Sequence, residues 1–498
     1  MEKKKIAIIG SGFSGISAAA YAAKAGHDVH VFERHAQPGG RARQFRTENG
    51  YVFDMGPSWY WMHDIIEGFF NDFNCTTGDF FNLVSLDPQF EIIFSDEKIS
   101  VPQKYKDIRK LFENTEKGAS LQYDKFMQAA KFKYEVGMQE FVNKPCYSWG
   151  EFLSLKIAKS AVKLNLLSNF RSYVGKYFSN PKLKILMEFP VIFLGASPKN
   201  IPALYSLMNY GGYALGTKYP MGGFYQLVLA MKQVAEKQGA SFHFNQNVQK
   251  LNVEESRLTS LTINGENYAF DAVIASSDYH HTETLLPSEF RNYPEKYWKS
   301  RTFAPSCLIY YLGVKEKIPH LKHHTLFFED DLDEHIDCIY ENQKWPEKPL
   351  FYCCCPSKTD PAVAPENSEN LFLLMPLATG IHDQESIRER YLEKMLLRIE
   401  KHTGAKGLLS KLEYKRSYCV SDFISDYNAY GGNAYGLANT LSQTAVLKPK
   451  IRNNKLENLF YTGQLTVPGP GVPPSVISGK IVANQLDHLK NKRYEKIV

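Results

Sequence analysis

The sequence predicts an α/β fold in which a Rossmann-type dinucleotide-binding domain is interleaved with a second, α+β domain. Three observations carry this prediction. A GxGxxG turn follows an apolar strand near the amino terminus, and another glycine-rich turn precedes an apolar helix near the carboxyl terminus. Between them, from about residue 95, the chain loses the pattern of a nucleotide-binding domain. The dinucleotide-binding domain is therefore expected to be assembled from separate segments of the chain.

The first element is a strand, a glycine turn and a helix. Residues Lys5–Ile9 form an apolar strand, and Ile16–Lys24 has the composition of a helix. Gly10 permits the tight turn, Gly12 lets the backbone approach a pyrophosphate, and Gly15 lets the helix pack closely on the strand. The amino terminus of the helix favours the phosphate charge. We therefore expect a dinucleotide to bind at this turn.

The second strand, Asp28–Phe32, ends at Glu33, which lies 18 residues after the last glycine of the turn. A carboxylate at this position accepts hydrogen bonds from a ribose diol and disfavours a 2′-phosphate, so FAD or NAD is expected rather than NADP. Gly39, Gly40 and Arg41 follow. A second glycine pair beside an arginine suits a second approach to the phosphates, which NAD-binding domains do not usually need. This pattern favours FAD.

Together with Gly56, Pro57 and Ser58, these motifs resemble the flavin amine oxidase superfamily. Within that superfamily the chain is most similar to the carotenoid desaturase branch, which includes the bacterial phytoene desaturases. The string FDMGPSW, a loop at Pro356–Pro361 and the carboxyl-terminal string TGQLTVPGPGVPPSVISG carry this resemblance. The loop itself is assigned no chemistry.

A basic segment lies between Lys144 and Lys184. It contains eight basic residues and one acidic residue, and apolar residues recur at steps of three and four from Leu153 to Phe178. This pattern is typical of one or two amphipathic helices. One interpretation is an ordinary helix with a solvated charged face. The other is a membrane-contacting face whose lysines meet lipid phosphates.

The chain then returns to the dinucleotide-binding pattern. Residues 219–231 resemble the family's PxGG turn and the helix after it, and Asp271–Asp278 resembles its returning strand. The resemblance implies that Val248 contacts adenine through its backbone. The alternative is that Val248 is a core residue of a strand.

The carboxyl-terminal element is a strand, a loop and a helix expected to start near Val476. Gly463 lies in the loop, and the amide of Val472 can point at the N1–C2=O edge of a flavin ring. There the helix dipole favours the negative charge of reduced flavin. A covalent cysteinyl link is not expected, because the segment from Gly463 to Ser478 contains no cysteine.

Neither cysteines nor histidines indicate a metal site. Three of the eight cysteines are consecutive, Cys353 to Cys355, and we interpret them as reduced thiols in or near a buried strand. His320, His323 and His324 cluster, but no carboxylate or thiol at ligand spacing completes a set. We predict no metal.

The resemblance implies an FAD-binding domain in three parts (residues 1–95, 218–300 and 435–498). The two intervening parts, residues 96–217 and 301–434, form an α+β substrate domain carrying membrane-facing helices. It further implies an FAD-dependent desaturase of carotenoid biosynthesis acting on phytoene or a similar long polyisoprenoid, with hydride transfer to flavin N5. Dioxygen or a quinone then reoxidises the flavin. The sequence identifies no catalytic residue.

Other functions remain open. A carotenoid cis–trans isomerase, a desaturase of a different carotenoid, an amine oxidase and a non-catalytic prenyl-binding protein like the Rab GDP-dissociation inhibitors share parts of this pattern. The net charge of +6 over 498 residues, without a basic arm, argues against a nucleic-acid partner. No apolar run is long enough to span a membrane, and no signal peptide is visible. We expect a cytoplasmic protein peripherally associated with the cytoplasmic membrane.

Overall fold

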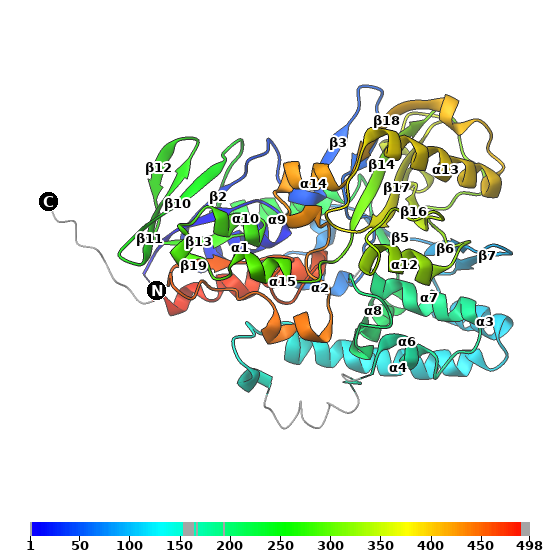
Figure 1. Ribbon diagram of the computed structural model, residues 1–498, viewed down its shortest axis with the longest axis horizontal. Coiled ribbons are helices and arrows are strands. Elements are labelled where there is room, and N and C mark those ends of the chain that lie inside the picture. Colours follow the sequence, from blue (N-terminus) through cyan, green and yellow to red (C-terminus); the bar gives the residue numbers. More distant parts are fainter. Residues whose placement is uncertain (1, 153–163, 166–167, 193–194, 490–498) are drawn as a thin grey trace.

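The computed structural model describes residues 2–489, apart from residues 153–163, 166–167 and 193–194. Two lobes share the chain (Figure 1), one built around a parallel sheet and the other around a larger mixed sheet. The predicted α/β class is confirmed. The five-part division into domains stays a prediction, although strand β6, within the predicted first part, belongs to the sheet of the second lobe.

The first lobe has three layers. Its centre is a five-stranded parallel sheet in the order β19-β13-β1-β2-β9. The strands come from three distant parts of the chain: β1 (Lys5–Ile9), β2 (Asp28–Phe32), β9 (Ser241–His243), β13 (Ala272–Ala275) and β19 (Leu459–Tyr461). Because both faces are covered, strands β1 and β13 are almost continuously apolar.

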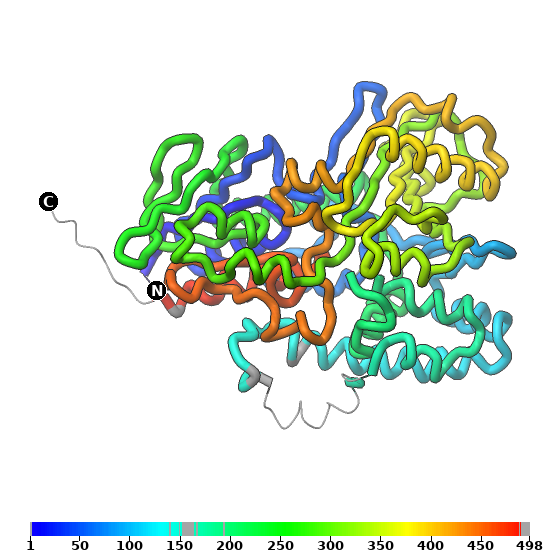
Figure 2. The backbone as a smooth tube through the Cα atoms, viewed as in Figure 1, coloured from blue at the N-terminus to red at the C-terminus, as the bar shows by residue number. Residues whose placement is uncertain are grey.

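Helices cover one face of this sheet and a small antiparallel sheet covers the other. The helices that pack there are α1 (Phe13–Lys24), α9 (Tyr225–Lys237) and α15 (Val472–Ala483). The opposite layer consists of β10 (Val248–Glu254), β11 (Arg257–Ile263) and β12 (Glu266–Ala269). Figure 2 shows the blue start and the red end of the chain running side by side in this lobe, as the contact between α1 and α15 requires.

The second lobe is built on a seven-stranded sheet in the order β18-β14-β17-β16-β15-β6-β7, in which only the β15–β6 pair is parallel. Its strands are β6 (Phe90–Ile93), β7 (Lys98–Val101), β14 (Ser306–Val314), β15 (His324–Phe327), β16 (Phe351–Cys354), β17 (Glu369–Leu377) and β18 (Leu412–Tyr418). Helix α13 (Glu385–Thr403) packs on one face. The other face packs against α3 (Tyr105–Thr115), α4 (Ala119–Val136), α6 (Phe170–Val174) and α7 (Pro181–Ile192).

Short elements connect the lobes. The two-stranded sheets pair β3 (Gln44–Arg46) with β4 (Val52–Asp54) and β5 (Leu83–Ser85) with β8 (Lys218–Pro220). The other α-helices in the part of the chain that the structure describes are α2 (His63–Asn71), α8 (Leu207–Asn209), α10 (Tyr279–Thr284), α11 (Glu295–Lys299), α12 (Leu332–Tyr340) and α14 (Val420–Tyr427).

One predicted boundary is wrong. Helix α15 begins at Val472, not near Val476, and Pro473 and Pro474 occupy its first turn. The first N–H groups of a helix have no partner within the helix, so proline is tolerated there. Val472 is therefore the first helical residue and directly follows the glycine-rich carboxyl-terminal loop.

Much of the basic segment lies outside the described residues, including Lys156, Lys159 and Lys163. Two of its described cations are paired within the protein. Arg171 bonds Glu188 and Asp333, and Lys182 bonds two acidic residues of the β6–β7 turn. These two cations are therefore already used in holding the lobe together. Within the described residues, no helix is long and apolar enough to cross a membrane.

Candidate functional site

A cavity of about 400 Å³ lies where the two lobes meet. The carboxyl ends of β1 and β13 form one wall, and residues of β14, β16 and β17 form part of the opposite wall. Twelve of the thirteen predicted site residues line it: Gly10, Gly12, Glu33, Gly39, Gly40, Arg41, Gly56, Pro57, Ser58, Val248, Gly463 and Val472. Only Gly15 does not.

The glycine turn shows why each glycine is present. A Cβ on Gly15 would lie 2.1 Å from the carbonyl oxygen of Gly10, so this position packs helix against strand. Gly10 has a φ of +96°, which favours glycine. A Cβ on Gly12 would meet no atom within 4 Å. Gly12 therefore borders open space, and helix α1 begins there without a side-chain cap, leaving its first N–H groups for a ligand anion.

Glu33 is held in place by the glycine turn. It is 6% exposed. One carboxylate oxygen accepts hydrogen bonds from the backbone N–H and the hydroxyl of Ser11 at 2.9 and 2.8 Å, and the other accepts from the N–H of His35 at 3.0 Å. A carboxylate oxygen has more than one acceptor site, so capacity for a ribose hydroxyl remains.

The Gly39–Gly40 pair packs against the GxGxxG turn. The N–H of Gly39 donates to the carbonyl of Ser11 at 2.8 Å, and a Cβ on Gly40 would lie 3.4 Å from Gly12 Cα. The two glycine-rich segments thus form one continuous backbone surface. This is the geometry that a second approach to the same phosphates needs.

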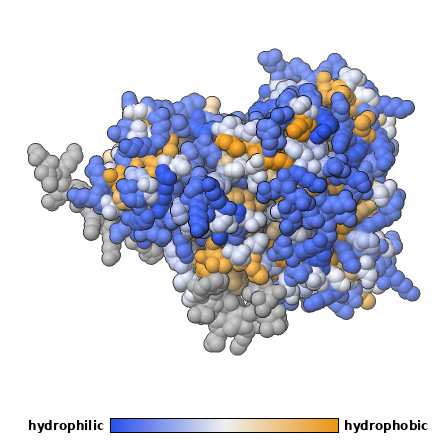
Figure 3. Space-filling model, in the orientation of Figure 1, coloured by the Kyte–Doolittle hydropathy of each residue, from blue (hydrophilic) through white to orange (hydrophobic). Residues whose placement is uncertain are grey.

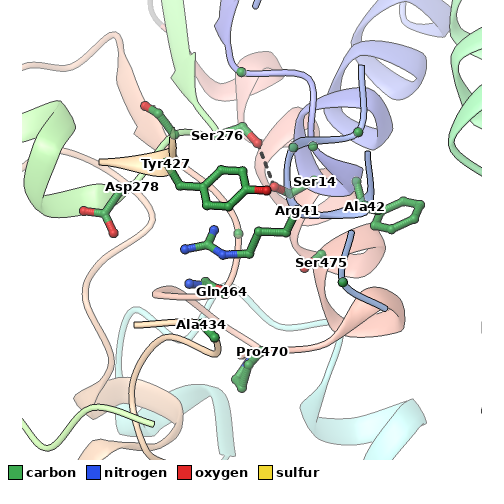
Figure 4. Close-up of a pocket in the computed structure, with 18 of the residues that line it drawn as sticks. Ser14, Arg41, Ala42, Ser276, Asp278, Tyr427, Ala434, Gln464, Pro470 and Ser475 are labelled. Carbon is green, nitrogen blue, oxygen red and sulfur yellow. Dashed lines mark hydrogen bonds between the residues drawn. The ribbon is translucent and has the colours of Figure 1, made fainter. Parts of the chain in front are cut away.

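Arg41 brings a buried cation into the cavity. Its Nη2 donates to the carbonyl of Asn433 at 3.2 Å, its guanidinium lies 5.0 Å from the ring centre of Tyr427, and its Nε has no partner among the described residues. Burial lowers the pKa of Arg41, and Asp278 lies close enough to oppose that shift. In Figure 4 the guanidinium points into the space between Tyr427 and Gln464. A buried cation with an unused donor fits an anionic ligand.

The block at residues 56–58 faces the same cavity. A Cβ on Gly56 would lie 2.6 Å from the carbonyl oxygen of Arg41, so glycine is required for this close approach. The hydroxyl of Ser58 bonds that of Tyr352 at 3.0 Å. Asp54, just before this block, accepts from the backbone N–H groups of Phe224 and Tyr225 and so fixes the start of α9. Burial raises the pKa of Asp54 to about 6.

The carboxyl-terminal loop closes the cavity against α1. Gly463 has a φ of +112°, and a Cβ there would lie 3.1 Å from the hydroxyl of Ser14. Ser14 in turn bonds Ser276 at 2.8 Å (Figure 4). Gly471, with a φ of +112°, precedes Val472 at the start of α15. Val248, which also lines the cavity, is the first residue of β10. Parts of the chain far apart in sequence therefore meet at the glycine turn.

Sequence reasoning missed several residues of this cavity. Asp278, Tyr427 and Gln464 surround Arg41 (Figure 4), and burial raises the pKa of Asp278. Asp278 was detectable, because it follows a strand of the same parallel sheet, and ligands bind at the carboxyl ends of such strands. Gln464 was detectable for the same reason, because it follows β19 of that sheet. Tyr427 had no such signal, since only folding brings α14 to the cavity.

The fold also groups three residues that the sequence spacing did not connect. One ligand atom each of His323, His324 and Cys354 lie within 4.8 Å of one another, and all three residues are buried. His324 and Cys354 are cross-strand neighbours on β15 and β16. Strand pairing thus brings a thiol to two of the histidines, although none stands at ligand spacing in the sequence, and the absence of a metal stays a prediction. Cys353, Cys354 and Cys355 are buried free thiols, as predicted.

These features define a dinucleotide-binding oxidoreductase fold whose site fits a flavin. Residues 13–487 match the family described as flavin containing amine oxidoreductase. The chain belongs to this family, and it is an FAD-dependent oxidoreductase.

Curated relatives and solved structures agree with this assignment. The chain is 38% identical to the carotenoid 3,4-desaturase of Haloarcula japonica over 484 residues, covering 97% of each chain. It is 27% identical to the zeta-carotene-forming phytoene desaturase of Myxococcus xanthus, covering 97% of this chain and 94% of the relative. Among solved structures, a putrescine oxidase variant aligns with a TM-score of 0.62 at 12% identity, covering 98% and 99% of the two chains. The last likeness shows the fold alone.

Proposed function

We propose that this protein is a carotenoid desaturase that removes hydrogens from a membrane-dissolved polyisoprenoid in carotenoid biosynthesis. The likeness to a carotenoid 3,4-desaturase over nearly the full length of both chains carries this proposal. Bound FAD supplies the oxidant, accepting hydride at flavin N5. Dioxygen or a membrane quinone is the proposed final electron acceptor.

We assign FAD binding to the residues predicted from the sequence. In this proposal Gly10, Gly12, Gly39 and Gly40 approach the pyrophosphate with their backbone, and Glu33 accepts hydrogen bonds from the ribose. The three other groups of predicted residues complete the site: Gly56, Pro57 and Ser58 beside Arg41, Val248 toward the adenine, and Gly463 and Val472 toward the flavin ring. Gly15 acts indirectly, by setting the distance between α1 and β1.

The wall opposite the glycine turn suits a hydrocarbon. It is lined by Met55, Trp59, Trp61, Met62, Met208, Ile309 and Leu374. A polyisoprenoid offers no charge and no hydrogen bond, so its binding rests on apolar burial, about 0.8 kcal/mol per CH2. An amine substrate gains little from such a wall. The apolar lining therefore favours a carotenoid over an amine.

Two carotenoid substrates are candidates. Phytoene follows from the predicted branch, and the higher identity to a 3,4-desaturase favours a carotenoid with a single bond between carbons 3 and 4. The purified holoprotein is mixed in air with liposomes containing one or the other, with and without added quinone. The pigments are then separated by chromatography, and their molecular masses are measured by mass spectrometry. Loss of pairs of hydrogens supports desaturation and identifies the substrate, an isomer of unchanged mass indicates an isomerase, and no change in either carotenoid contradicts the proposal.

We also propose that the protein contacts the membrane peripherally. Leu441 and Leu447 are 50% and 42% exposed, and Tyr147 is 40% exposed. Lys450 Nζ lies 3.1 Å from the carbonyl oxygen of Tyr147 and 3.5 Å from that of Val446, so a cation lies beside Tyr147 and the segment that carries Leu447. Figure 3 shows hydrophobic surface gathered at the lower edge of the molecule. Exposed apolar groups beside basic residues favour an anionic lipid surface.

A further inference from the structure

A buried tyrosine–histidine pair stands at the wall of the cavity that faces the glycine turn. Tyr352 lies on β16 and lines the cavity. Its hydroxyl is 2.6 Å from Nδ1 of His324 on the neighbouring strand β15 and 3.0 Å from the hydroxyl of Ser58. Tyr352 is 4% exposed and His324 is fully buried. One end of this hydrogen-bonded chain therefore borders the cavity, and the other end is an imidazole shielded from water.

The surroundings fix both rings. The imidazole of His324 stacks on the indole of Trp59 at 4.3 Å, with 12° between the planes, and Trp59 also lines the cavity. Burial holds the pKa of His324 well below its usual value, so the resting ring is neutral and readily gives up an added proton. The Tyr352 O–H donates to Ser58 Oγ, and rotation of this O–H turns it toward Nδ1 of His324. A neutral imidazole whose proton is on Nε2 then accepts the hydrogen bond at Nδ1. Nε2 of His324 has no hydrogen-bond partner among the described residues, so no other group competes for the ring.

The three carboxylates that line the cavity are committed elsewhere. Glu33 is bound by Ser11 and His35, and Asp426 pairs with Arg43 at 2.7 Å. Asp278 accepts from the N–H of His281 and lies near the Arg41 cation. All three carboxylates belong to the side of the glycine turn and α14. On the β-sheet wall, the described lining residues are Cys307, Ile309, Tyr352 and Leu374.

We propose that Tyr352, backed by His324, is the group that takes the proton in the desaturation. This inference rests on the proposed function. Removing two hydrogens as a hydride and a proton needs an acceptor for each, and oxidised FAD takes the hydride. The sequence identified no residue for the proton. Tyr352 is the cavity residue on the β-sheet wall that has a basic nitrogen at hydrogen-bond distance behind its hydroxyl.

In the proposed step, one C–H bond of the substrate gives its electron pair and hydrogen to the oxidised flavin. The neighbouring C–H bond breaks, its electron pair becomes the new C=C bond, and its proton goes to the hydroxyl oxygen of Tyr352. The phenolic proton of Tyr352 moves to Nδ1 of His324. The proton returns through Tyr352 to water when the product leaves. The proton leaves in the same step as the hydride, so loss of the group that accepts it slows flavin reduction itself.

The test uses the holoenzyme and a substrate shown to be active. Flavin reduction is followed without oxygen in stopped flow, in wild type and in three variants. Tyr352→Phe keeps the ring and removes the hydroxyl. His324→Asn keeps a polar partner for Tyr352 but removes the basic nitrogen. Tyr310→Phe is the matched control, because Tyr310 is a fully buried tyrosine of the same sheet whose hydroxyl bonds the carbonyl of Arg388 and which does not line the cavity.

We expect Tyr352→Phe to slow flavin reduction about 100-fold and His324→Asn at least 10-fold, with FAD content and substrate affinity unchanged. Tyr310→Phe should stay within about threefold of wild type. A substrate deuterated at the carbon that loses the proton adds a readout that a structural defect does not move. Its isotope effect should increase in Tyr352→Phe, because proton removal then limits the rate.

Two results would overturn the inference while leaving the proposed function intact: Tyr352→Phe as fast as the control, or slowed with an unchanged isotope effect. Failure of wild type to reduce its flavin with any carotenoid would instead overturn the proposed function, and the inference with it. Metal analysis of the purified holoprotein completes the test. A stoichiometric metal ion removed by Cys354→Ser would show that His324 is a ligand and not a proton acceptor.

Discussion

Gly15 and Gly12 lie three residues apart, and the structure predicts opposite consequences when each is replaced by alanine. At Gly15 the new Cβ would lie 2.1 Å from the Gly10 carbonyl oxygen, with Ser276 Oγ at 3.0 Å. Ordinary contacts of this kind are no shorter than about 3.4 Å. The helix and the strand must therefore separate by more than an ångström, and both are backbone elements of a packed core.

Overpacking of this kind costs about 1–3 kcal/mol or more. We expect Gly15→Ala to lower the unfolding temperature by several degrees and to lose FAD as well, because the glycine turn moves. Gly12→Ala has room for its Cβ and an ordinary φ of −72°. Its unfolding temperature as apoprotein should match wild type. Its FAD affinity should fall at least tenfold, about 1.4 kcal/mol, because the methyl group enters the space proposed for the pyrophosphate.

The assay pairs thermal unfolding of each apoprotein with the flavin-to-protein absorbance ratio after dialysis against FAD. Gly68→Ala is the matched control, because Gly68 lies within helix α2, has no positive φ, and a Cβ there would meet no atom within 4 Å. Normal stability of Gly15→Ala would refute the packing argument. Normal flavin content of Gly12→Ala would refute the placement of the pyrophosphate.

Three further predictions concern the ribose contact, the buried Asp54 carboxyl and the exposed leucines. Glu33→Ala should weaken FAD retention while the protein stays folded, and unchanged flavin content after dialysis would refute the ribose role. Burial raises the pKa of Asp54 from its ordinary value of 3.8 to about 6, so the folded protein binds the carboxyl proton more tightly than the unfolded chain does. The contribution of Asp54 to stability is therefore largest below pH 4 and is lost as the pH rises through 6, by up to about 3 kcal/mol. Relative to Asp54→Asn, wild type should gain unfolding temperature between pH 7 and pH 4, and a pH-independent difference would contradict this. Finally, Leu441→Ser with Leu447→Ser should reduce flotation with anionic liposomes about tenfold while leaving FAD content unchanged, and equal flotation would argue against this membrane surface.

Local patterns predicted the parts of the fold whose structure is set locally. Strands β1 and β2 have the predicted bounds, because a short apolar run followed by glycine or an acid leaves little choice. Helix α15 begins four residues before the predicted start near Val476, because the first turn of a helix accepts its two prolines. The predicted site residues were found because each glycine or acid has its own backbone reason to be present.

The residues that face the glycine turn could not be found in this way. Tyr352 and His324 are neighbours only because β15 and β16 pair, and the sequence between them gives no register. His324 and Cys354 face each other for the same reason. Pairing between strands fixes these contacts, and a single sequence carries no direct signal of it. Proposals about the opposite wall therefore depend on the three-dimensional structure.

The contact between α1 and α15 has a consequence for synthesis of the chain. A Cβ on Gly479 would lie 2.4 Å from the Ser14 carbonyl oxygen, so the two helices pack backbone to backbone. At the usual speed of translation, roughly half a minute or more separates the emergence of these helices from the ribosome. During that time the apolar face of α1 lacks its partner and the flavin pocket has only one side. A nascent chain is therefore expected to bind flavin only after translation is nearly finished, and to need protection of that surface until then.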